Sequence, residues 1–581
     1  MHDVSLLGLL AVPLLGSLLI FALPAGRDLL AKQIALAASV LTFGYAVVLG
    51  VAFKTTENAS RFQFNGSWVW IKNLGVHFAF GLDGIALVLI AMATLLVPCV
   101  VLSSWHTFDS VESAEELRAP TRSPKAFFGL VLLLEVFMIG VFAATDVFLF
   151  YVFFEAMLVP MYFIIGSFGG PRRQYAAMKF FLYSLVGGLL MLASVIGVYV
   201  SSGTSSFAFT DLVGHIPNGA SQKWLFLGFF IAFAIKAPLF PFHTWLPDAG
   251  AEAPAGGAAL LVGVLDKVGT FGFLRYCLPL FPQASRDFAM PILILSVIGV
   301  LYAAFLAMGQ RDMKRLVAYT SVAHFGFIGL GIFAFTTQAI SGAVLYMVNH
   351  GLATALLFLV VGMLTARGGS RNIRDYGGVG KVAPLLGGFF LIGALATIAM
   401  PGTNSFVSEF LVLIGTFTRH PAWSIIATTG IVLAAVYMLW IYQRTMTGPV
   451  RGDAVLGQPD HGPVPDTETR SPQDRPHDTL HGSAHGSSPV GSPQHGAVSV
   501  ATPTAASVRV RFGDLSRREV AVLTPLVVLI IFLGLYPKPV LDVINPTAQR
   551  TVAQSCHTDP AVAAPAAGYD STRTVTEDLC Q

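Results

Sequence analysis

Long apolar runs dominate this 581-residue sequence and constrain its fold more than any other feature. Many of them exceed the roughly 20 residues that a helix needs to cross a bilayer. Only 12% of the residues are charged, against roughly 25% in a soluble domain, and the mean hydropathy is +0.70. These values exclude a soluble enzyme, a nucleic-acid-binding protein and a disordered scaffold. Because open sheet edges cannot be satisfied in hydrocarbon, the sequence predicts an all-α polytopic membrane protein.

We predict about fourteen membrane-spanning helices from these runs. Two of them are interrupted by Pro and Gly, one at 236–247 and one at 400–404. Each interruption falls in the fourth helix of a group of five, and two such groups must enter the membrane from opposite sides. Inverted repeats with one broken helix each are common in secondary transporters. The predicted organisation is a three-span segment at 1–125, a first half at 126–280, an inverted second half at 281–448, a loop at 449–514, and a last span with a tail at 515–581.

Two segments between the spans differ from the rest in composition. Residues 54–80 are polar and aromatic, and we expect a small ordered cap on the outer membrane surface, with a hairpin as one form. Residues 449–514 are rich in Pro, Gly, Ser, Thr and His, which is typical of a disordered cytoplasmic loop. His477, His481 and His485 have the spacing of metal ligands on one helix face, but the surrounding Gly and Pro oppose a helix.

Lys and Arg are unevenly distributed between the short loops. The loops that follow odd-numbered spans carry more than twice as many, so this side should be cytoplasmic and both termini outside. The four cysteines form no CxxC motif, and therefore no iron–sulfur or zinc framework is expected. Cys99 and Cys277 lie in spans and should stay reduced, whereas Cys556 and Cys580 lie in the outer tail, where we expect a disulfide.

Several ionisable side chains lie inside the predicted spans. Each costs about 2.5–3.5 kcal/mol at a helix centre, which makes them candidates for function. A lone buried histidine is more often a satisfied core residue, but carboxylates and lysines together at similar depth indicate a proton relay. In span order they could form a row in the membrane plane, which predicts lateral proton movement. The candidates are Glu135, Glu155, Lys236, Asp266, Lys267, His324, His350 and Glu409.

The two broken helices fit these charges. Lys236 lies where a half-helix ends, and the free carbonyl groups there favour an ammonium ion. We expect Glu409 in the first turn of a half-helix capped by Asn404 or Ser405, where free N–H groups favour a carboxylate. Burial opposes the charge on both groups. These opposed effects allow both groups to change protonation state near neutral pH.

Three motifs resemble those of a known family. They are FFEAMLVPMY at 153–162, KAPLFPFHTWLPDA at 236–249 and FVSEF at 406–410. Each resembles subunit M, the mitochondrial subunit 4 family, of proton-pumping NADH:quinone oxidoreductase, which is respiratory complex I. The resemblance extends over 75–446 and is specific to the antiporter-like superfamily. Glu409 discriminates within it, because the sister subunits L and N and the Mrp-type antiporters usually carry Lys there.

The resemblance implies roles for the buried charges. Glu155 and Lys236 would form an ion pair in the first half, with Lys267 as the central relay. His324 and His350 would link the halves, leading to a terminal proton site at the FVSEF glutamate. The chain would be a non-catalytic proton-pumping subunit without cofactors, because NADH, FMN, iron–sulfur clusters and quinone would bind other subunits.

The resemblance also implies partners and a location. The partners would be other membrane-arm subunits, especially L and N, together with lipids and no nucleic acid. An excess of Arg over Lys is typical of a GC-rich bacterium, so we expect the bacterial plasma membrane.

Asp266 departs from the family pattern, which has an apolar residue at that position. Neighbouring helix residues point about 100° apart, so Asp266 and Lys267 cannot share one face. We therefore expect Asp266 to reach a cation or hydroxyl on another helix and to take part in proton handling. The alternative is a neutral, hydrogen-bonded Asp packed between helices. Glu135 should join the Glu155 pair from the neighbouring helix.

Two other functions compete with a redox-driven pump. One is an Mrp-type sodium/proton antiporter subunit without redox coupling. The other is a membrane spacer whose charges only lock an assembly. Co-purifying subunits would separate the first two, and neutralising the charges would identify a spacer, because a spacer would keep pumping.

Overall fold

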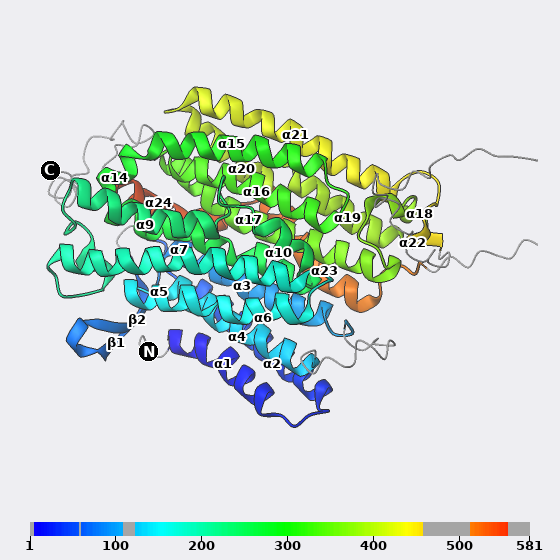
Figure 1. Cartoon of the computed structure of the whole chain (residues 1–581), viewed down its shortest axis with the longest axis horizontal. Coiled ribbons are helices and arrows are strands. Elements are labelled where there is room, and N and C mark those ends of the chain that lie inside the picture. Colours follow the sequence, from blue (N-terminus) through cyan, green and yellow to red (C-terminus); the bar gives the residue numbers. More distant parts are fainter. Residues whose placement is uncertain (1–4, 57–59, 108–122, 457–511, 556–581) are drawn as a thin grey trace, which may run out of the picture.

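The computed structural model describes residues 5–56, 60–107, 123–456 and 512–555. Within these ranges the chain is almost entirely helical, and the long helices run side by side along the longest axis (Figure 1). This confirms the predicted helical class. Most of the predicted 449–514 loop lies outside the described ranges, as do the tail cysteines of the expected disulfide. Cys99 and Cys277 are buried and free, as predicted.

Fourteen labelled helices lie between residues 5 and 287. They are α1 (Ser5–Ala22), α2 (Asp28–Ala52), α3 (Gly84–Ser103), α4 (Pro124–Ala143), α5 (Val147–Ala156), α6 (Leu158–Phe168), α7 (Arg173–Ser202), α8 (Phe209–Leu212), α9 (Ala220–Lys236), α10 (Leu246–Glu252), α11 (Ala255–Leu260), α12 (Lys267–Gly272), α13 (Leu278–Leu280) and α14 (Pro282–Asp287).

The remaining described residues contain ten labelled helices. They are α15 (Ala289–Met308), α16 (Met313–Ile332), α17 (Thr337–Gly368), α18 (Val379–Val382), α19 (Pro384–Thr397), α20 (Asn404–Phe417), α21 (Pro421–Met446), α22 (Asp453–Leu456), α23 (Arg517–Leu535) and α24 (Lys538–Gln554).

Eleven helical segments among the described residues are long and apolar enough to cross a membrane. Three shorter apolar helices accompany them: Leu6–Ala22, Pro384–Thr397 and Asn404–Phe417. Large apolar side chains are exposed along α1, α2, α7 and α21, where a soluble protein would carry polar groups. The chain is thus a multi-pass membrane protein whose outer helices turn apolar side chains toward lipid.

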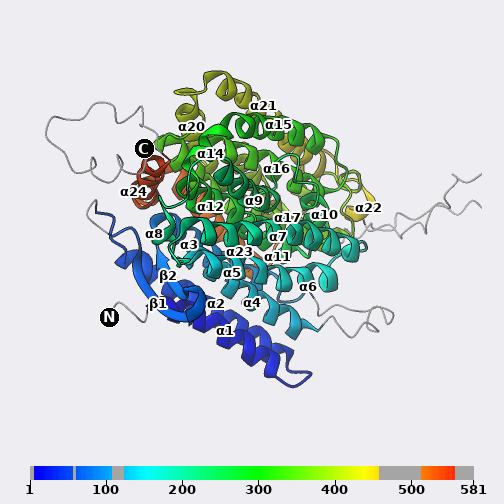
Figure 2. The same cartoon turned by 60° about the vertical axis from the view of Figure 1, so that its left-hand side comes forward.

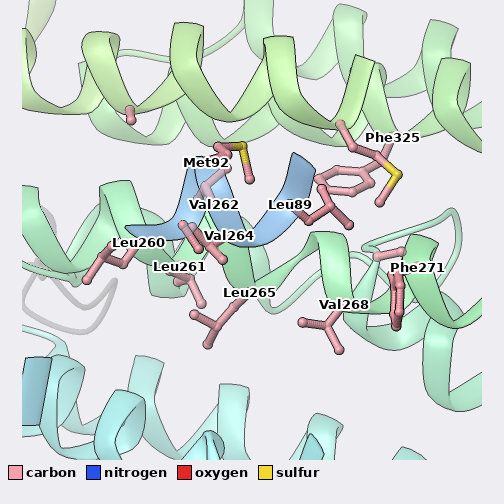
Figure 3. Packing of buried hydrophobic residues seen from close by; sticks show 14 of the residues in the cluster. Leu89, Met92, Leu260, Leu261, Val262, Val264, Leu265, Val268, Phe271 and Phe325 are labelled. Atoms are coloured by element: carbon pink, nitrogen blue, oxygen red, sulfur yellow. The ribbon is translucent and has the colours of Figure 1, made fainter. Parts of the chain in front are cut away.

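The centre of the molecule is built around α17, which is buried along most of its length. It packs against α16, α19, α20, α23 and α24, and also against α3 and α11. Figure 3 shows Leu89 and Met92 of α3 and Phe325 of α16 packed around the segment that carries Leu265 and Val268. Helices α1 and α2 lie at one edge of the molecule and α21 at the opposite edge (Figures 1 and 2).

The polar segment before α3 forms the expected hairpin. Strand β1 (Gln63–Ile71) pairs antiparallel with β2 (Val76–Leu82), and Ser67 lies opposite Ala79 in the register. Gly75 makes the turn with a positive φ of 64°, which glycine adopts at little cost. Arg61, just before β1, lies over the Phe209 ring at 4.6 Å, and burial lowers the pKa of its guanidinium to about 10.

The two ends of the helix bundle differ. The β1–β2 hairpin, α14 and α24 lie at one end, and α18 and α22 lie at the other (Figure 1). The short connections at the second end carry many of the arginines that the sequence assigns to the cytoplasmic side.

Two spans and the tail depart from their predicted form. The fifth is split at Met157 into α5 and α6, because Pro160 has no N–H to continue the helical hydrogen bonds. The eighth is not one α-helix, since π-helices at Leu261–Leu265 and Phe273–Cys277 flank α12. The segment after the last span, predicted as a tail, forms the amphipathic α24, which packs on α3 and α17.

Candidate proton-transfer site

The first broken helix ends at a buried lysine. Helix α9 stops at Lys236, where Pro238 cannot continue the helical hydrogen bonds, and the chain turns before α10 begins at Leu246. Trp245 Nε1 donates to the Ile235 carbonyl at 2.8 Å and so satisfies one acceptor at the helix end. Lys236 is 1% exposed, and its Nζ lies 5.1 Å from the centre of the Phe154 ring.

The carboxylates of the first half do not form the predicted ion pair by direct contact. Glu155 is half-buried on α5. Glu155 and Lys236 do not form an ion pair among the described residues, so no Glu155 carboxyl oxygen lies within 4.0 Å of Lys236 Nζ. Glu135 is fully buried on α4, and neither of its carboxyl oxygens has a hydrogen-bond partner in the described part of the chain.

Lys267 lies at the centre of the row, in the first turn of α12. Its Nζ donates to the carbonyl of Val262 in the preceding π-helix and lies 2.7 Å from His350 Nδ1 on α17. π-Helical turns inside α-helices are frequent at functional sites. The irregular backbone brings Lys267 and the middle of α17 into direct contact.

Asp266 does not reach the partner that we predicted. Both of its carboxyl oxygens are buried and lack a hydrogen-bond partner among the residues the structure describes. Asp266 joins the π-helix at Leu261–Leu265 to α12, a backbone geometry that the prediction of a regular α-helix does not include. An unpaired carboxylate is costly in such a place, which favours a group that holds a proton.

The second half continues the series from His350. The His324 and His350 rings lie 5.2 Å apart and nearly perpendicular, and the His324 ring lies 5.7 Å from that of Tyr346. Tyr346 Oη donates to Glu409 Oε1 at 3.2 Å. All four side chains are buried. Lys267 and Glu409 are therefore connected through two imidazole rings and a phenol.

The second break is held by two asparagines. Asn349 Nδ2 donates to the Asn404 carbonyl at 2.7 Å, and Asn404 Nδ2 donates to the Asn349 carbonyl at 3.1 Å. The predicted cap is wrong, because the N-cap of α20 is Thr403 and its side chain makes no capping hydrogen bond. Glu409 consequently lies in the second turn of α20, one or two residues farther from the free N–H groups than predicted.

Sequence reasoning missed Tyr346 and Asn349. Tyr346 precedes His350 by four residues and therefore lies on the same face of α17, a spacing that could have identified it. Asn349 had no comparable signal. A charged cluster was missed too: Asp248 of α10 pairs with Lys179 at 2.7 Å and with Arg315 at 2.9 Å.

No group of three or more His, Cys, Asp or Glu residues within the described ranges has the arrangement of a metal site. The site consists of protonatable side chains in a largely apolar surrounding.

Comparison with known proteins identifies the family. Residues 144–434 match the family model of the membrane region of NADH:quinone oxidoreductase and Mrp antiporters. The NADH-quinone oxidoreductase subunit M of Mycobacterium tuberculosis is 44% identical, and the alignment covers 99% of both chains.

Solved structures give the same answer. A chain of respiratory complex I from Thermus thermophilus is 28% identical with a TM-score of 0.75, covering 96% of this chain and 100% of that one. A chain of the Mrp complex from Dietzia sp. has a TM-score of 0.76 at 20% identity, covering 95% and 97%, and shares the fold alone. The alternative of an Mrp-type antiporter subunit is thus less supported than a subunit of complex I. This chain belongs to the subunit M family of NADH-quinone oxidoreductase, the antiporter-like subunits of the membrane arm of complex I.

Proposed function

We propose that this chain carries protons through the membrane arm along the row of buried groups that ends at Glu409. The observation that carries the proposal is the series Lys267, His350, His324, Tyr346 and Glu409, with its short contacts at both ends. Each member can take up and release a proton. Apolar residues would stabilise the interior better than such a series, so a purely structural role does not explain these groups.

The chemistry of the series follows from its hydrogen bonds. Lys267 as an ammonium donates to His350 Nδ1, so the proton can move onto a neutral imidazole over one hydrogen bond. The Tyr346 hydroxyl both accepts and donates and can relay a proton to Glu409. The wider steps between the rings require a bridging water or a side-chain rotation.

In the first half, Glu135, Glu155, Lys236 and Asp266 would supply protons to Lys267. Asp266 and Lys236 are both buried and neither side chain is hydrogen-bonded among the described residues. A proton arriving at either changes the charge beside Lys267, and the change favours transfer toward His350. The two halves would be coupled in this way.

The proposed architecture has fourteen spans, with 126–280 and 281–448 as inverted repeats and both termini outside. Support comes from packing, because α7 packs on the broken α9 in the first half as α17 packs on the broken α20 in the second. The segments at 1–125 and 515–581 would flank the two halves.

The proposed partners are the sister antiporter-like subunits L and N and membrane lipids, in a bacterial plasma membrane. NADH, FMN, iron–sulfur clusters and quinone would bind other subunits, and this chain would carry out no redox chemistry. Its contribution to the enzyme would be proton translocation coupled to electron transfer elsewhere in the complex.

The experiment replaces Glu155 and, separately, Glu409 by Gln in the intact complex. We expect assembly and NADH oxidation with an artificial acceptor to persist, while NADH-driven proton uptake by inverted vesicles falls at least about tenfold. Asp287→Asn is the control, since this carboxylate pairs with Lys223 at the surface. Normal proton uptake in both Gln variants would refute the proposal and favour a structural spacer.

A further inference from the structure

A cavity of about 580 Å³ opens at the end of the molecule that carries α18 and α22. It lies between the α15–α16 connection, the segment before α18 and the end of α21. Its lining contains four arginines, two aromatic residues and no carboxylate: Met308, Gly309, Gln310, Arg311, Ile373, Arg374, Tyr376, Trp440, Arg444 and Arg451.

The backbone around this cavity is held by hydrogen bonds between segments far apart in the sequence. Ile373 N donates to the Arg311 carbonyl at 2.9 Å, and this fixes Arg311 and Arg374 beside each other. Arg451 N donates to the Gly377 carbonyl at 3.1 Å and draws the chain after α21 back over the cavity. The arginines are therefore presented by fixed backbone rather than by free loops.

The four arginines differ from other arginines at this end of the molecule. Arg315, Arg367 and Arg371 each pair with a carboxylate. The cavity arginines have no carboxylate within 4.0 Å in the described part of the chain.

Two nearby acids are already engaged. Asp312 pairs with Arg371 at 3.3 Å, and the Asp375 carboxylate accepts hydrogen bonds from Ser370 and Asn372. Four arginine side chains around one cavity thus have no carboxylate partner among the described residues, which favours the binding of an anion there.

The position of the cavity indicates which anion. Helix α21 lies at the edge of the molecule (Figure 1), and Val432, Val436 and Leu439 are exposed along it, as side chains that face lipid are. Trp440 follows them, half-buried, and lines the cavity. Trp is enriched where hydrocarbon meets the head-group layer. The cavity therefore lies at head-group level, beside a lipid-facing helix.

We propose that this cavity binds the phosphate head group of an anionic phospholipid whose acyl chains lie along α21. Guanidinium groups bind phosphate oxygens in pairs of parallel hydrogen bonds, and basic pockets between membrane helices on the cytoplasmic side bind such head groups. The site is separate from the buried proton row and does not depend on the function proposed for that row.

The experiment titrates the full-length chain in detergent with short-chain phosphatidylglycerol and, in parallel, with phosphatidylcholine, and counts bound lipid by native mass spectrometry. The test variant is Arg374→Gln with Arg444→Gln. The matched control is Arg173→Gln with Arg517→Gln, which removes the same charge at residues that do not line the cavity. We expect phosphatidylglycerol to bind more tightly than phosphatidylcholine, and the test variant to lose about 10- to 30-fold in affinity while the control does not.

Three outcomes would overturn the proposal. Equal losses in the test and control variants would mean that only overall charge matters. Inorganic phosphate that displaces phosphatidylglycerol at equal concentration would identify free phosphate as the ligand. Binding by the isolated chain that disappears in the purified complex would indicate that an acidic segment of a partner subunit occupies the cavity.

Discussion

At the scale of single residues, the row depends on side chains that differ in how firmly they are held. Lys267 and Glu409 each have a hydrogen-bonded neighbour, whereas Glu135 and Asp266 have none in the described part of the chain. In the proposed relay, the hydrogen-bonded groups would direct the proton, whereas a charge on the groups without partners would be costly.

Tyr346→Phe tests the link between the histidines and Glu409. The variant keeps the ring and removes only the hydroxyl that donates to Glu409. We expect assembly to persist and NADH-driven proton uptake to fall about tenfold or more, because no other described side chain donates to that carboxylate.

Tyr276→Phe is the control for this change, since its hydroxyl is equally buried and has no hydrogen-bond partner in the described residues. Similar uptake in the Tyr346 variant and the control would remove the phenol from the pathway.

Asp266→Leu tests whether the unusual carboxyl group handles protons. No hydrogen bond between described residues is lost, so assembly and thermal stability should be retained. We expect the rate or the pH profile of proton uptake to change, because a protonatable group that interacts with Lys236 and Lys267 disappears. A variant with the wild-type pH profile would assign Asp266 a packing role only.

At the scale of elements, the interruptions of helices place the charges. Helix α9 ends at Lys236, π-helices flank the helix of Lys267, and α20 begins five residues before Glu409. Backbone groups freed by these interruptions need partners inside the protein. Trp245 supplies one for α9 by donating to the Ile235 carbonyl, and Asn404 Oδ1 accepts from the Ser405 N–H at the start of α20.

Asn349→Leu tests the anchoring of the second break. The variant keeps the volume but removes the hydrogen bonds to the Asn404 carbonyl and to Ser408 Oγ. Losing these two buried hydrogen bonds should cost about 1–3 kcal/mol, which predicts a lower unfolding temperature of the chain in detergent.

Thr354→Val is the control for this variant on the same helix, because Thr354 is buried and no hydrogen bond of its hydroxyl is found among the described residues. Unfolding temperatures that fall equally in both variants would show that any polar deletion in α17 has the same effect.

At the scale of the whole molecule, the last span is anchored by its own first residues. Asp514 accepts hydrogen bonds from the backbone N–H groups of Leu385 and Leu386, at the start of α19, at 2.9 and 3.1 Å. Glu519 pairs with Arg367 at 2.7 Å and closes a capping box with Ser516. Helix α23 therefore has fixed contacts of its own after the long loop.

Deleting 465–505 tests whether the long loop is dispensable. Because α21 and α23 are anchored independently, we expect the shortened chain to assemble into the complex and to support normal proton uptake. Asp514→Ala in the full-length chain serves as a comparison that weakens the anchor itself. Loss of the complex on deletion, with the Asp514 variant intact, would assign a docking role to the loop.

Much of the fold and most of the candidate row could be predicted from the sequence. The apolar runs require membrane helices, and Pro and Gly at 236–247 and 400–404 locate the breaks. The buried charges stand out because each is costly in an apolar run. These features are local, and each one can be recognised without knowing what lies beside it.

Only the tertiary structure decided which of these residues meet. Lys267 contacts His350, which lies 83 positions later in the sequence, and Tyr346 reaches Glu409 on another helix. Asp266 has no hydrogen-bond partner of the kind that helix geometry alone predicted, and the π-helix before it is a feature that this geometry does not include. Periodicity assigns a residue to a helix face, but the packing of one helix against another, which depends on the whole chain, determines what that face contacts.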